Sequence, residues 1–585
     1  MQNAEIAEIL QNIGDLLELK GESVFKVRAY QRAARSVESY PEEVDTLADD
    51  LGKLRGIPGV GKEIALKIQE LITTGRLDYY ESLRAGLPEG VTELLNVPGI
   101  GPKTAYRLAS ELGVKDIQQL QEALDQGLVA ALPRMGEKSA DNIRRNLESL
   151  RRKDARMPLG SALLEVEKIL QGLRAESAIH DLTVAGSIRR FRETVGDVDL
   201  VCTSEEPEKA IRAFVGLPWV DRVLAEGTTK ASVILRSGLQ ADFRVLEKER
   251  FGTLLQYFTG SKEHNVLLRE RALRMGLSLS DLAIVRLEDN GEETYDNEEG
   301  VYRRLGLDWI PPELREQRGE IEAAAAGMLP TLVTLADIKG DLHVHTDWSD
   351  GEASVAVMVE EAARRGYAYV CITDHSVGRG IAHGLSFDRL KEQRLLIEQA
   401  RRAHPGLVVL HGSEVDIRSD GSLDYPDDVL AWLDYAIGSI HSAMGQSREV
   451  MTERIIRAMG NPYITVIGHL TTRLLGEREP VDLDVERVFR AARKTGTALE
   501  VNASPHRLDL KDSHIYRARE IGVPLIINTD AHAPRSLDDM RFGVAVARRG
   551  WCRAEDILNA REWDAFSAFI AAKRPSASAR RRAVS

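Results

Sequence analysis

Residues Ala185-Gly-Ser-Ile-Arg-Arg-Phe-Arg-Glu-Thr-Val-Gly-Asp-Val-Asp-Leu200 join a glycine–serine turn to an apolar run that carries two carboxylates. Side chains alternate between the two faces of a strand, so we expect Asp197 and Asp199 to share one face. Asp242 supplies a third carboxylate in a second strand-like run, residues 239–246. Three carboxylates on neighbouring strands could hold two divalent cations for in-line attack on a phosphate. Alone, the aspartate pair is equally compatible with a chance Gly-Asp-x-Asp turn.

The composition indicates several globular domains without a membrane span. The 585 residues suffice for roughly three to five domains. The net charge is −13, and residues 1–150 hold 18 Lys and Arg against 24 Asp and Glu, a balance that argues against a nucleic-acid partner bound by bulk charge. Any such contact would have to come from local patches, helix N-termini and metals. Three scattered cysteines predict neither a disulfide framework nor a cysteine-based zinc site. With no signal peptide and no apolar run of membrane length, we expect a cytoplasmic protein.

Two segments of the helical region 4–150 resemble each other, residues 54–68 and 95–108, and a weaker third copy spans 132–140. Each good copy has a Pro-Gly-x-Gly turn that opens an amphipathic helix, whose free N–H groups can face a phosphate. They resemble helix-hairpin-helix elements, which bind the DNA backbone without reading sequence. An ordinary helical hairpin is the alternative. The glycines expected to approach DNA are Gly59, Gly61, Gly99 and Gly101.

In helix-hairpin-helix elements, backbone carbonyls also bind a monovalent cation, K⁺ or Na⁺. The resemblance implies two such cation sites in this chain, one for each good copy of the motif. The residues that would supply the carbonyl groups are Arg55, Ile57 and Val60 in the first copy, and Leu95, Val97 and Ile100 in the second.

Residues 154–250 alternate strand-like and helix-like runs around the opening stretch. Gly186 and Ser187 lie where a tight turn could cradle a triphosphate with backbone N–H groups. Arg190 can donate to phosphate oxygens bidentately, or it can form a surface salt bridge with a nearby acid. The candidate acids are Glu205, Glu206 and Glu208.

A second motif follows at residues 256–269. Tyr257 and Phe258 precede Gly260, and Asn265 and Arg269 have the i, i+4 spacing of one helix face. Aromatic rings can stack on a sugar or base, and Asn and Arg can reach the minor groove, where readout is nearly sequence-blind. Ordinary core packing is the alternative for the two aromatic residues.

Residues 1–315 resemble a family X DNA polymerase, the group that includes polymerase beta. The resemblance is carried by the motifs 186–190 and 196–199, by Asp242, and by the motif 257–269. It implies an all-α helix-hairpin-helix region, followed by an α/β nucleotidyltransferase palm and a thumb. One position departs from polymerase beta: Gln240 stands where that enzyme has arginine, so a primer-phosphate contact is lost or is taken over by Arg244.

The family roles transfer to matching positions. Asp197 and Asp199 would bind both metal ions, Mg²⁺ or Mn²⁺, and Asp242 would bind the catalytic ion and help activate the primer 3′-hydroxyl. Other residues would hold the phosphates of the incoming nucleotide, flank its sugar or probe the base pair. These are Gly186, Ser187, Arg190, Tyr257, Phe258, Gly260, Asn265 and Arg269.

The family's N-terminal domain can also remove a 5′-deoxyribose phosphate with a Schiff-base lysine. Lys67 lies at the matching position, and Lys26 and Tyr30 match the pocket for the 5′-phosphate. Phe25 and Glu63 replace a histidine and a lysine of polymerase beta, which makes this pocket less cationic. Because cationic neighbours are one way to depress the pKa of a lysine nucleophile, a solvated helix lysine is an equal alternative.

Eleven of the 13 histidines lie at or after His343, which indicates a C-terminal domain with its own chemistry. Seven strand-like runs follow residue 338, and six of them carry His, Asp or Glu at or just past their carboxyl ends, where parallel α/β barrels place their active sites. The seventh carries Glu500 and Asn502, which could support the ligands. Mixed imidazole and carboxylate ligands suit Zn²⁺ or Mn²⁺.

This region resembles a PHP (polymerase and histidinol phosphatase) domain, a distorted (β/α)7 barrel that binds up to three metal ions, here Mn²⁺ or Zn²⁺. All nine ligand positions of that family are filled. They are His343, His345, Asp350, His375, Glu414, His441, His469, Asp530 and His532.

The expected parts are an N-terminal helical domain (1–82), a second helical subdomain (83–153), the palm (154–250), the thumb (251–315), a linker (316–337), the PHP domain (338–572) and a disordered basic tail (573–585). The linker's alanine run could form a short helix.

Together the resemblances imply a monomeric bacterial polymerase of the nucleoid that uses dNTPs on gapped or nicked DNA, in base excision repair or end joining. Its barrel would be a 3′–5′ exonuclease, with AP-endonuclease or 3′-end-processing activity besides. One alternative is a histidinol-phosphatase-like enzyme tethered to DNA by the hairpins. A second is a non-catalytic scaffold that binds DNA ends.

Overall fold

The computed structural model of the chain describes residues 3–575, apart from 21, 39, 41–43, 49, 58, 86, 89, 96, 98–99, 133–134, 137–139, 141–142, 145–155 and 379–381. Two compact units emerge from its contacts, Met1–Arg156 and Met157–Ser585. Among the described residues, no helix has both the length and the apolar character needed to cross a bilayer. Of the predicted tail, Lys573 ends the last helix, and residues 576–585 lie outside the described part.

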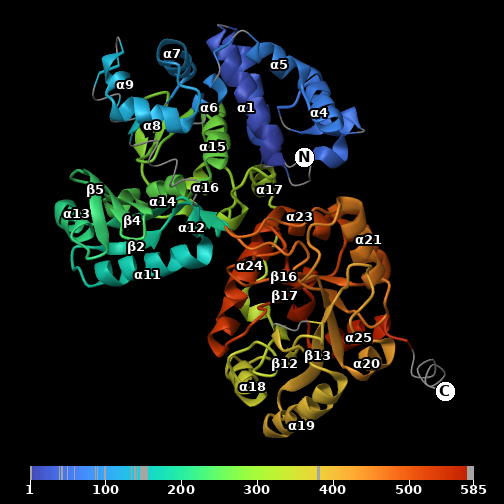
Figure 1. Cartoon of the computed structure of the whole chain (residues 1–585). Helices are drawn as coiled ribbons and strands as arrows, with labels where there is room; N and C mark the ends of the chain where they lie inside the picture. Colours follow the sequence, from blue (N-terminus) through green and yellow to red (C-terminus); the bar gives the residue numbers. More distant parts are fainter. Residues whose placement is uncertain are drawn as a thin grey trace. The chain divides into compact units, whose positions relative to one another are not determined.

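The first unit is helical throughout its described residues (blue in Figure 1). One continuous hydrophobic cluster runs from Ile6 to Ile143, so the two predicted helical parts, 1–82 and 83–153, share a core. The helices are α1 (Asn3–Leu19), α2 (Val24–Glu38), η1 (Val44–Leu47), α3 (Leu51–Gly56), α4 (Lys62–Thr74), α5 (Asp78–Arg84), α6 (Val91–Leu95), α7 (Pro102–Leu112), α8 (Ile117–Asp125) and α9 (Leu128–Ala131).

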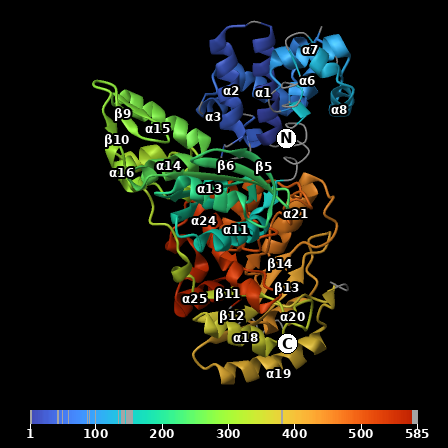
Figure 2. The same ribbon diagram turned by 90° about the vertical axis from the view of Figure 1, so that its left-hand side faces the viewer.

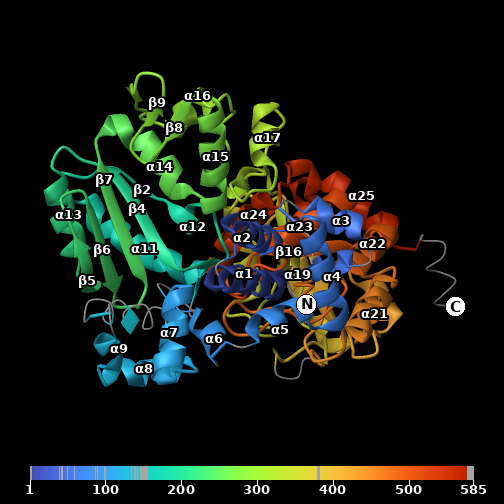
Figure 3. The same ribbon diagram turned by 90° about the horizontal axis from the view of Figure 1, so that it is seen from above.

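The palm is a five-stranded sheet in the order β2-β4-β7-β6-β5, in which only β4 and β7 pair in parallel (Figure 3). Apolar side chains alternate along these strands: Leu200 and Phe243 pack with helices on one face, and Val201 packs with the thumb helix on the other. The elements are β1 (Met157–Pro158), α11 (Leu159–Arg174), β2 (His180–Val184), α12 (Gly186–Arg189), β3 (Thr194–Val195), β4 (Asp197–Thr203), α13 (Pro207–Val215), β5 (Val220–Glu226), β6 (Lys230–Leu235), β7 (Gln240–Leu246) and η2 (Lys248–Arg250).

The thumb packs helices against a small antiparallel sheet of order β10-β9-β8. Its elements are α14 (Phe251–Thr259), α15 (Lys262–Arg274), β8 (Leu277–Leu279), β9 (Ile284–Arg286), β10 (Glu292–Glu293), α16 (Glu298–Arg304) and η3 (Pro312–Leu314). The segment predicted as a linker contains α17 (Glu320–Ala325) and η4 (Leu335–Asp337). The alanine run therefore forms a helix, and it is held in place because buried Glu320 accepts a hydrogen bond from His264 Nδ1 (2.8 Å).

The C-terminal part is a seven-stranded parallel barrel with its strands in sequence order, as predicted. A parallel bridge between Val344 and Ala531 joins the first strand to the end of the last, so the barrel is nearly closed. Its strands are β11 (Gly340–Val344), β12 (Tyr369–Ile372), β13 (Val408–Asp416), β14 (Tyr435–Ser439), β15 (Val466–Ile467), β16 (Ala498–Asn502) and β17 (Leu525–Asn528).

Helices surround the barrel strands on the outside (Figure 2). They are α18 (Val355–Arg364), α19 (Phe387–Ala403), α20 (Asp427–Trp432), α21 (Arg448–Met459), α22 (Val485–Thr495), α23 (Asp512–Ile521), η6 (Pro534–Asp539), α24 (Met540–Arg549), η7 (Ala554–Asp556), η8 (Leu558–Ala560) and α25 (Trp563–Lys573).

A buried carboxylate, Glu298, ties the palm to the thumb. It accepts two hydrogen bonds from Arg189 of the palm, both 2.8 Å, and two from Arg315, 2.6 and 3.1 Å. Trp309 Nε1 donates a further bond of 3.1 Å. Burial would raise the pKa of Glu298, but Arg315 and Arg189 lower it to about 2, so the side chain is ionised and fully paired.

Glu298→Ala should lower the free energy of unfolding by about 3–5 kcal/mol, because it leaves Arg189 and Arg315 without the carboxylate that both of them bind. Urea denaturation of the full chain measures the change. The neighbouring exposed Glu299 gives a matched control, Glu299→Ala, with an expected change within about 0.5 kcal/mol. Equal stability of the two variants would show that the ion cluster does not hold the palm to the thumb.

Candidate active sites

The three palm carboxylates lie together because of the register between β4 and β7. Asp197 pairs with Gln240 and Asp199 with Asp242 across these parallel strands. Burial and the neighbouring carboxylates of Asp197 and Asp242 raise the pKa of Asp199 to about 7. Arg190 and Arg244 act in the opposite direction but do not offset the burial and the like charges, which fits a site for divalent cations.

Gly186 must be a glycine in this arrangement. Its φ is +61°, and a Cβ atom there would lie 2.0 Å from Oδ2 of Asp199. The adjacent Ser187 Oγ is buried and has no hydrogen-bond partner among the described residues. The turn therefore brings a free hydroxyl next to the carboxylates, as a phosphate ligand would require.

Gln240, the departure from polymerase beta, supports the third carboxylate. Its Nε2 donates to Asp242 Oδ2 at 2.9 Å, and Ser232 Oγ donates to the other oxygen. Arg244, predicted as a replacement primer contact, lies with its guanidinium 5.1 Å from the ring centroid of Phe258. That replacement stays a prediction, whereas the bond from Gln240 gives this residue a local role.

Arg190 forms an ion pair, but with a different acid from those considered. Its Nε lies 3.0 Å from Glu316 Oε1, and its Nη1 donates to the backbone oxygen of Thr259. Glu206 and Glu208, two of the candidate acids, instead pair with lysine and arginine side chains of α13. The alternative of a surface salt bridge was therefore wrong in both setting and partner, because the pair with Glu316, which lies outside the palm, is buried.

The motif after the palm is partly buried. The rings of Tyr257 and Phe258 meet edge to face at 5.5 Å. Asn265 Nδ2 donates to the backbone oxygen of Tyr257 at 2.7 Å, so this side chain braces the motif from inside. Arg269 is exposed on the same helix.

Gly260 has a φ of +65° and lies close to the Arg190 side chain. A Cβ atom at position 260 would lie 3.2 Å from Arg190 Nη1, so the glycine leaves room for this guanidinium.

The barrel brings all nine predicted ligands to the carboxyl ends of its strands. Three groups of ligand atoms lie within 4.8 Å of one another among the described residues. They are His345, Asp350, His375 and His532; His343, His345 and Asp530; and His375, Glu414 and His441.

Glu414 occupies the centre of this cluster. Its carboxylate lies 2.8 Å from His375 Nδ1, 3.2 Å from His441 Nε2 and 2.8 Å from His469 Nε2, so His469 joins the site through it. His343 Nε2 and both ring nitrogens of His345 are buried without a hydrogen-bond partner among the described residues. Buried nitrogen lone pairs beside carboxylates fit divalent metal ions of the Zn²⁺ or Mn²⁺ type.

Two further carboxylates orient the ligands. Glu500 accepts from His343 Nδ1 at 2.7 Å, and Asp416 accepts from His441 Nδ1 at 2.6 Å. Such bonds fix the ring and turn its other nitrogen toward the centre. Glu500 was expected in this role. Asp416 was missed, although it stands two residues after Glu414 on the same strand, a spacing that places both on one face.

In the first unit, Lys26, Tyr30 and Lys67 gather around Tyr79, a residue that the sequence analysis did not single out. Lys67 Nζ lies 4.6 Å from the Tyr79 ring centroid, and Lys26 Nζ lies 5.9 Å from it. The Tyr30 and Tyr79 rings stack at 6.3 Å. Phe25 is 88% exposed beside them. The three predicted pocket residues are therefore neighbours.

The two hairpin motifs have matching backbone geometry. Val60 N donates to Ile57 O and Ile100 N donates to Val97 O, both at 3.0 Å. Gly61 and Gly101 each precede the first residue of a helix, α4 and α7. Gly99 lies outside the described residues. The internal repeat seen in the sequence is thus a repeat in structure.

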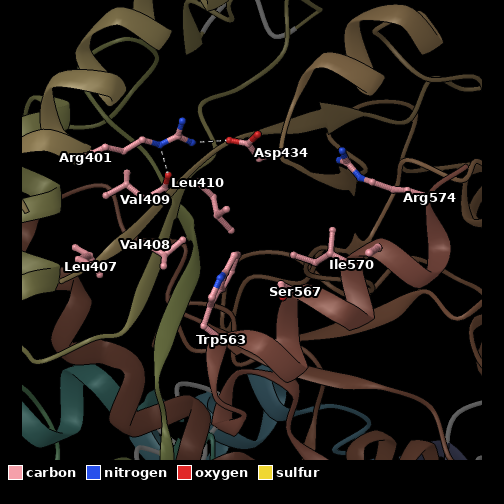
Figure 4. A pocket seen from close by; sticks show the side chains of 11 residues that line it. Arg401, Leu407, Val408, Val409, Leu410, Asp434, Trp563, Ser567, Ile570 and Arg574 are labelled. Carbon is pink, nitrogen blue, oxygen red and sulfur yellow. Dashed lines mark hydrogen bonds and ion pairs between the residues drawn. The ribbon is translucent and has the colours of Figure 1, made fainter. Parts of the chain in front are cut away.

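A cavity of about 400 Å³ lies away from these sites, beside the start of β13 (Figure 4). Arg401 lines it, but its guanidinium is already bonded to Asp434 and to the backbone oxygen of Val409, each at 2.7 Å. None of the predicted ligands lines this cavity, so it is no candidate for the metal chemistry.

Four family models match the chain: a helix-hairpin-helix domain at residues 1–77, a SAM-like helix-hairpin-helix tandem at 91–149, a DNA polymerase beta thumb at 254–316 and a PHP domain at 341–504. The DNA polymerase/3′-5′ exonuclease PolX of Bacillus subtilis (strain 168) is 39% identical over 572 residues, 97% of this chain and 99% of that protein. A probable phosphatase of Thermoanaerobacter sp. (strain X514) is 32% identical over 35% of this chain and 83% of its own length. DNA polymerase lambda of Arabidopsis thaliana is 23% identical over 54% of this chain and 62% of its own length.

Glu414→Gln should weaken divalent metal binding by at least about 100-fold, because it removes the charge at the centre of the imidazole cluster. The measurement is the Mn²⁺ or Zn²⁺ that stays bound after gel filtration, determined by elemental analysis. Glu392→Gln, an exposed change on α19, is the control and should retain the wild-type metal content. Full metal content in Glu414→Gln would contradict the assignment of this site.

Proposed function

Because the chain belongs to the bacterial family X DNA polymerases that carry a PHP domain, we propose that it extends DNA primers at the palm and removes nucleotides from 3′ ends at the barrel. One observation carries this proposal: the three palm carboxylates and a barrel cluster of eight side chains at metal-binding distances, which His469 joins through Glu414, occur in the same compact unit. The relative that matches 97% of the chain is named for both activities.

At the palm, the primer 3′-oxygen would attack the α-phosphorus of a dNTP, and pyrophosphate would leave. Asp242, held by Gln240 and Ser232, would take the hydroxyl proton. Ser187 Oγ and the guanidinium of Arg190 would donate to the phosphate oxygens. Divalent cations, once bound at the palm or at the barrel, supply positive charge that stabilises the pentacovalent phosphate.

At the barrel, water would add to the terminal phosphodiester, and the bond to the preceding 3′-oxygen would break, releasing a nucleoside monophosphate. Glu500 and Asp416 would keep the other ring nitrogens of His343 and His441 turned toward the centre of the ligand cluster. We propose up to three Mn²⁺ or Zn²⁺ ions here, held by the nine ligands, and Mg²⁺ or Mn²⁺ at the palm. The same barrel chemistry would serve for AP-site cleavage and for trimming blocked 3′ ends.

The natural substrate would be gapped or nicked DNA in base excision repair or end joining, handled by a monomer in the bacterial nucleoid. Support comes from the two matching hairpin motifs, in which Gly61 and Gly101 each precede a helix and have open space where a Cβ would lie. K⁺ or Na⁺ at the carbonyls of each hairpin would add to that contact. A small-molecule phosphatase is the second candidate, favoured only by relatives that match about a third of the chain.

Paired variants separate the two activities on one gapped substrate with a labelled primer. Asp197→Asn/Asp199→Asn should lower extension at least about 100-fold and leave primer shortening intact, because the palm loses its preorganised charge. His343→Ala/His345→Ala should do the reverse. If the wild-type chain changes no primer but hydrolyses a small phosphomonoester, the phosphatase candidate replaces this proposal.

We also propose that Lys67 forms a Schiff base with the aldehyde of a 5′-deoxyribose phosphate, with loss of water, before β-elimination. Its closeness to Lys26 and Tyr30 supports this role. Borohydride should then crosslink the wild-type chain to such a substrate, and Lys67→Ala should lose the crosslink. Lys53→Ala, an exposed change outside the cluster, is the control. An unchanged crosslink in Lys67→Ala would refute the assignment.

A further inference from the structure

A chain of ion pairs crosses from the palm to the barrel. Arg190 Nε and Arg549 Nη1 both lie 3.0 Å from Glu316 Oε1, so one carboxylate oxygen joins an arginine of the palm to an arginine of the barrel. On its other side, Arg549 Nη2 donates to Asp512 Oδ2 at 2.6 Å. The Arg549 side chain is only 3% exposed. The network is therefore a buried junction.

Arg549 also contacts the backbone of Arg190. Its Nη1 donates to the Arg190 carbonyl oxygen at 2.6 Å. The same guanidinium thus fixes the main chain of Arg190 and the carboxylate that orients its side chain. Thr259, whose backbone oxygen accepts from Arg190 Nη1, fixes a third point. Together these contacts leave little freedom for the Arg190 side chain.

The contacts occupy one edge of the Arg190 guanidinium and leave another edge free. Nε and Nη1 are engaged, whereas Nη2 has no hydrogen-bond partner among the described residues. Since a phosphate oxygen needs a free and well-oriented N–H donor, this geometry suits nucleotide binding. Burial would raise the pKa of Glu316, but Arg549 and Arg190 lower it to about 2, so the bridging carboxylate is charged.

We propose that Arg549, on helix α24 of the barrel, is a positioning residue for nucleotide binding at the palm. It holds Glu316 and the Arg190 backbone so that the free edge of Arg190 faces the triphosphate. The inference rests on the proposed polymerase activity and adds a dependence of that activity on a residue of the hydrolytic barrel. Asp512, at the start of α23, orients Arg549 in turn.

The next residue on the same helix provides a matched control. Arg548 Nε donates to Glu313 Oε1 at 2.7 Å, and its Nη1 donates to the backbone oxygen of Val333 at 3.1 Å. Arg548→Ala therefore removes a comparable ion pair between the barrel and the end of the thumb. It leaves the contacts to Arg190 and Glu316 in place.

The test measures KM for dNTP and kcat on gapped DNA for the full chain. Arg549→Ala should raise KM about tenfold, the scale of one charge-assisted hydrogen bond, and change kcat by less than about twofold. Primer shortening without dNTPs should match the wild type, which shows that the barrel is folded. Arg549→Lys should restore part of the affinity, since an ammonium can still donate to Glu316.

The decisive measurement compares the Arg190→Ala variant with and without the Arg549→Ala change. If Arg549 acts through Arg190, adding Arg549→Ala to Arg190→Ala should raise KM no further. The inference is overturned if the KM increases caused by the two changes multiply, or if Arg548→Ala raises KM as much as Arg549→Ala does. It is also overturned if Arg549→Ala lowers both extension and shortening and Arg549→Lys restores neither. A wild-type chain that extends no primer would overturn the polymerase proposal as well.

Discussion

Strand register is the constraint on which both sites depend. Asp199 faces Asp242 only because β4 and β7 pair in parallel at that register. Side chains alternate along a strand, so a slip of one residue would bury the carboxylates and expose Leu200 and Phe243. Burial of these two apolar residues thus keeps the acids on the opposite face of the palm sheet. In the barrel the same rule operates over seven parallel strands, whose carboxyl ends meet at one rim.

The two sites balance their charges differently. At the palm, burial with two like charges raises the pKa of Asp199 to about 7, although Arg190 and Arg244 act to lower it. The barrel mixes acids with imidazoles. Burial would raise the pKa of Glu414, yet His441 and His375 hold it well below its usual range. The barrel cluster is therefore largely compensated by its own side chains, whereas the palm depends on charge that arrives with its substrate.

Local patterns indicated which side chains would lie together, because strand ends and residue spacing are encoded in short stretches. Eight of the nine predicted barrel positions lie at metal-binding distances from one another, and Asp199 lies opposite Asp242. Their roles as ligands stay predictions. Contacts between distant segments could not be predicted in this way. Two partners of Arg190, Glu316 and Arg549, stand 126 and 359 positions away, and no local pattern links an arginine to either of them. The role of Gln240 was also missed, although Gln240 stands two residues before Asp242 on the same strand, the spacing that places two side chains on one face.

Closure of the barrel joins β11 to the end of β17, where His345 N donates to the Ala531 backbone oxygen at 2.8 Å. During synthesis, which proceeds from the N-terminus, the three palm carboxylates leave the ribosome long before Asp530 and His532. A nascent chain can therefore fold its palm while the hydrolytic centre still lacks two ligands. Because Arg549 follows His532 in the chain, the proposed positioning contact to Arg190 forms only after the last barrel ligand has been made.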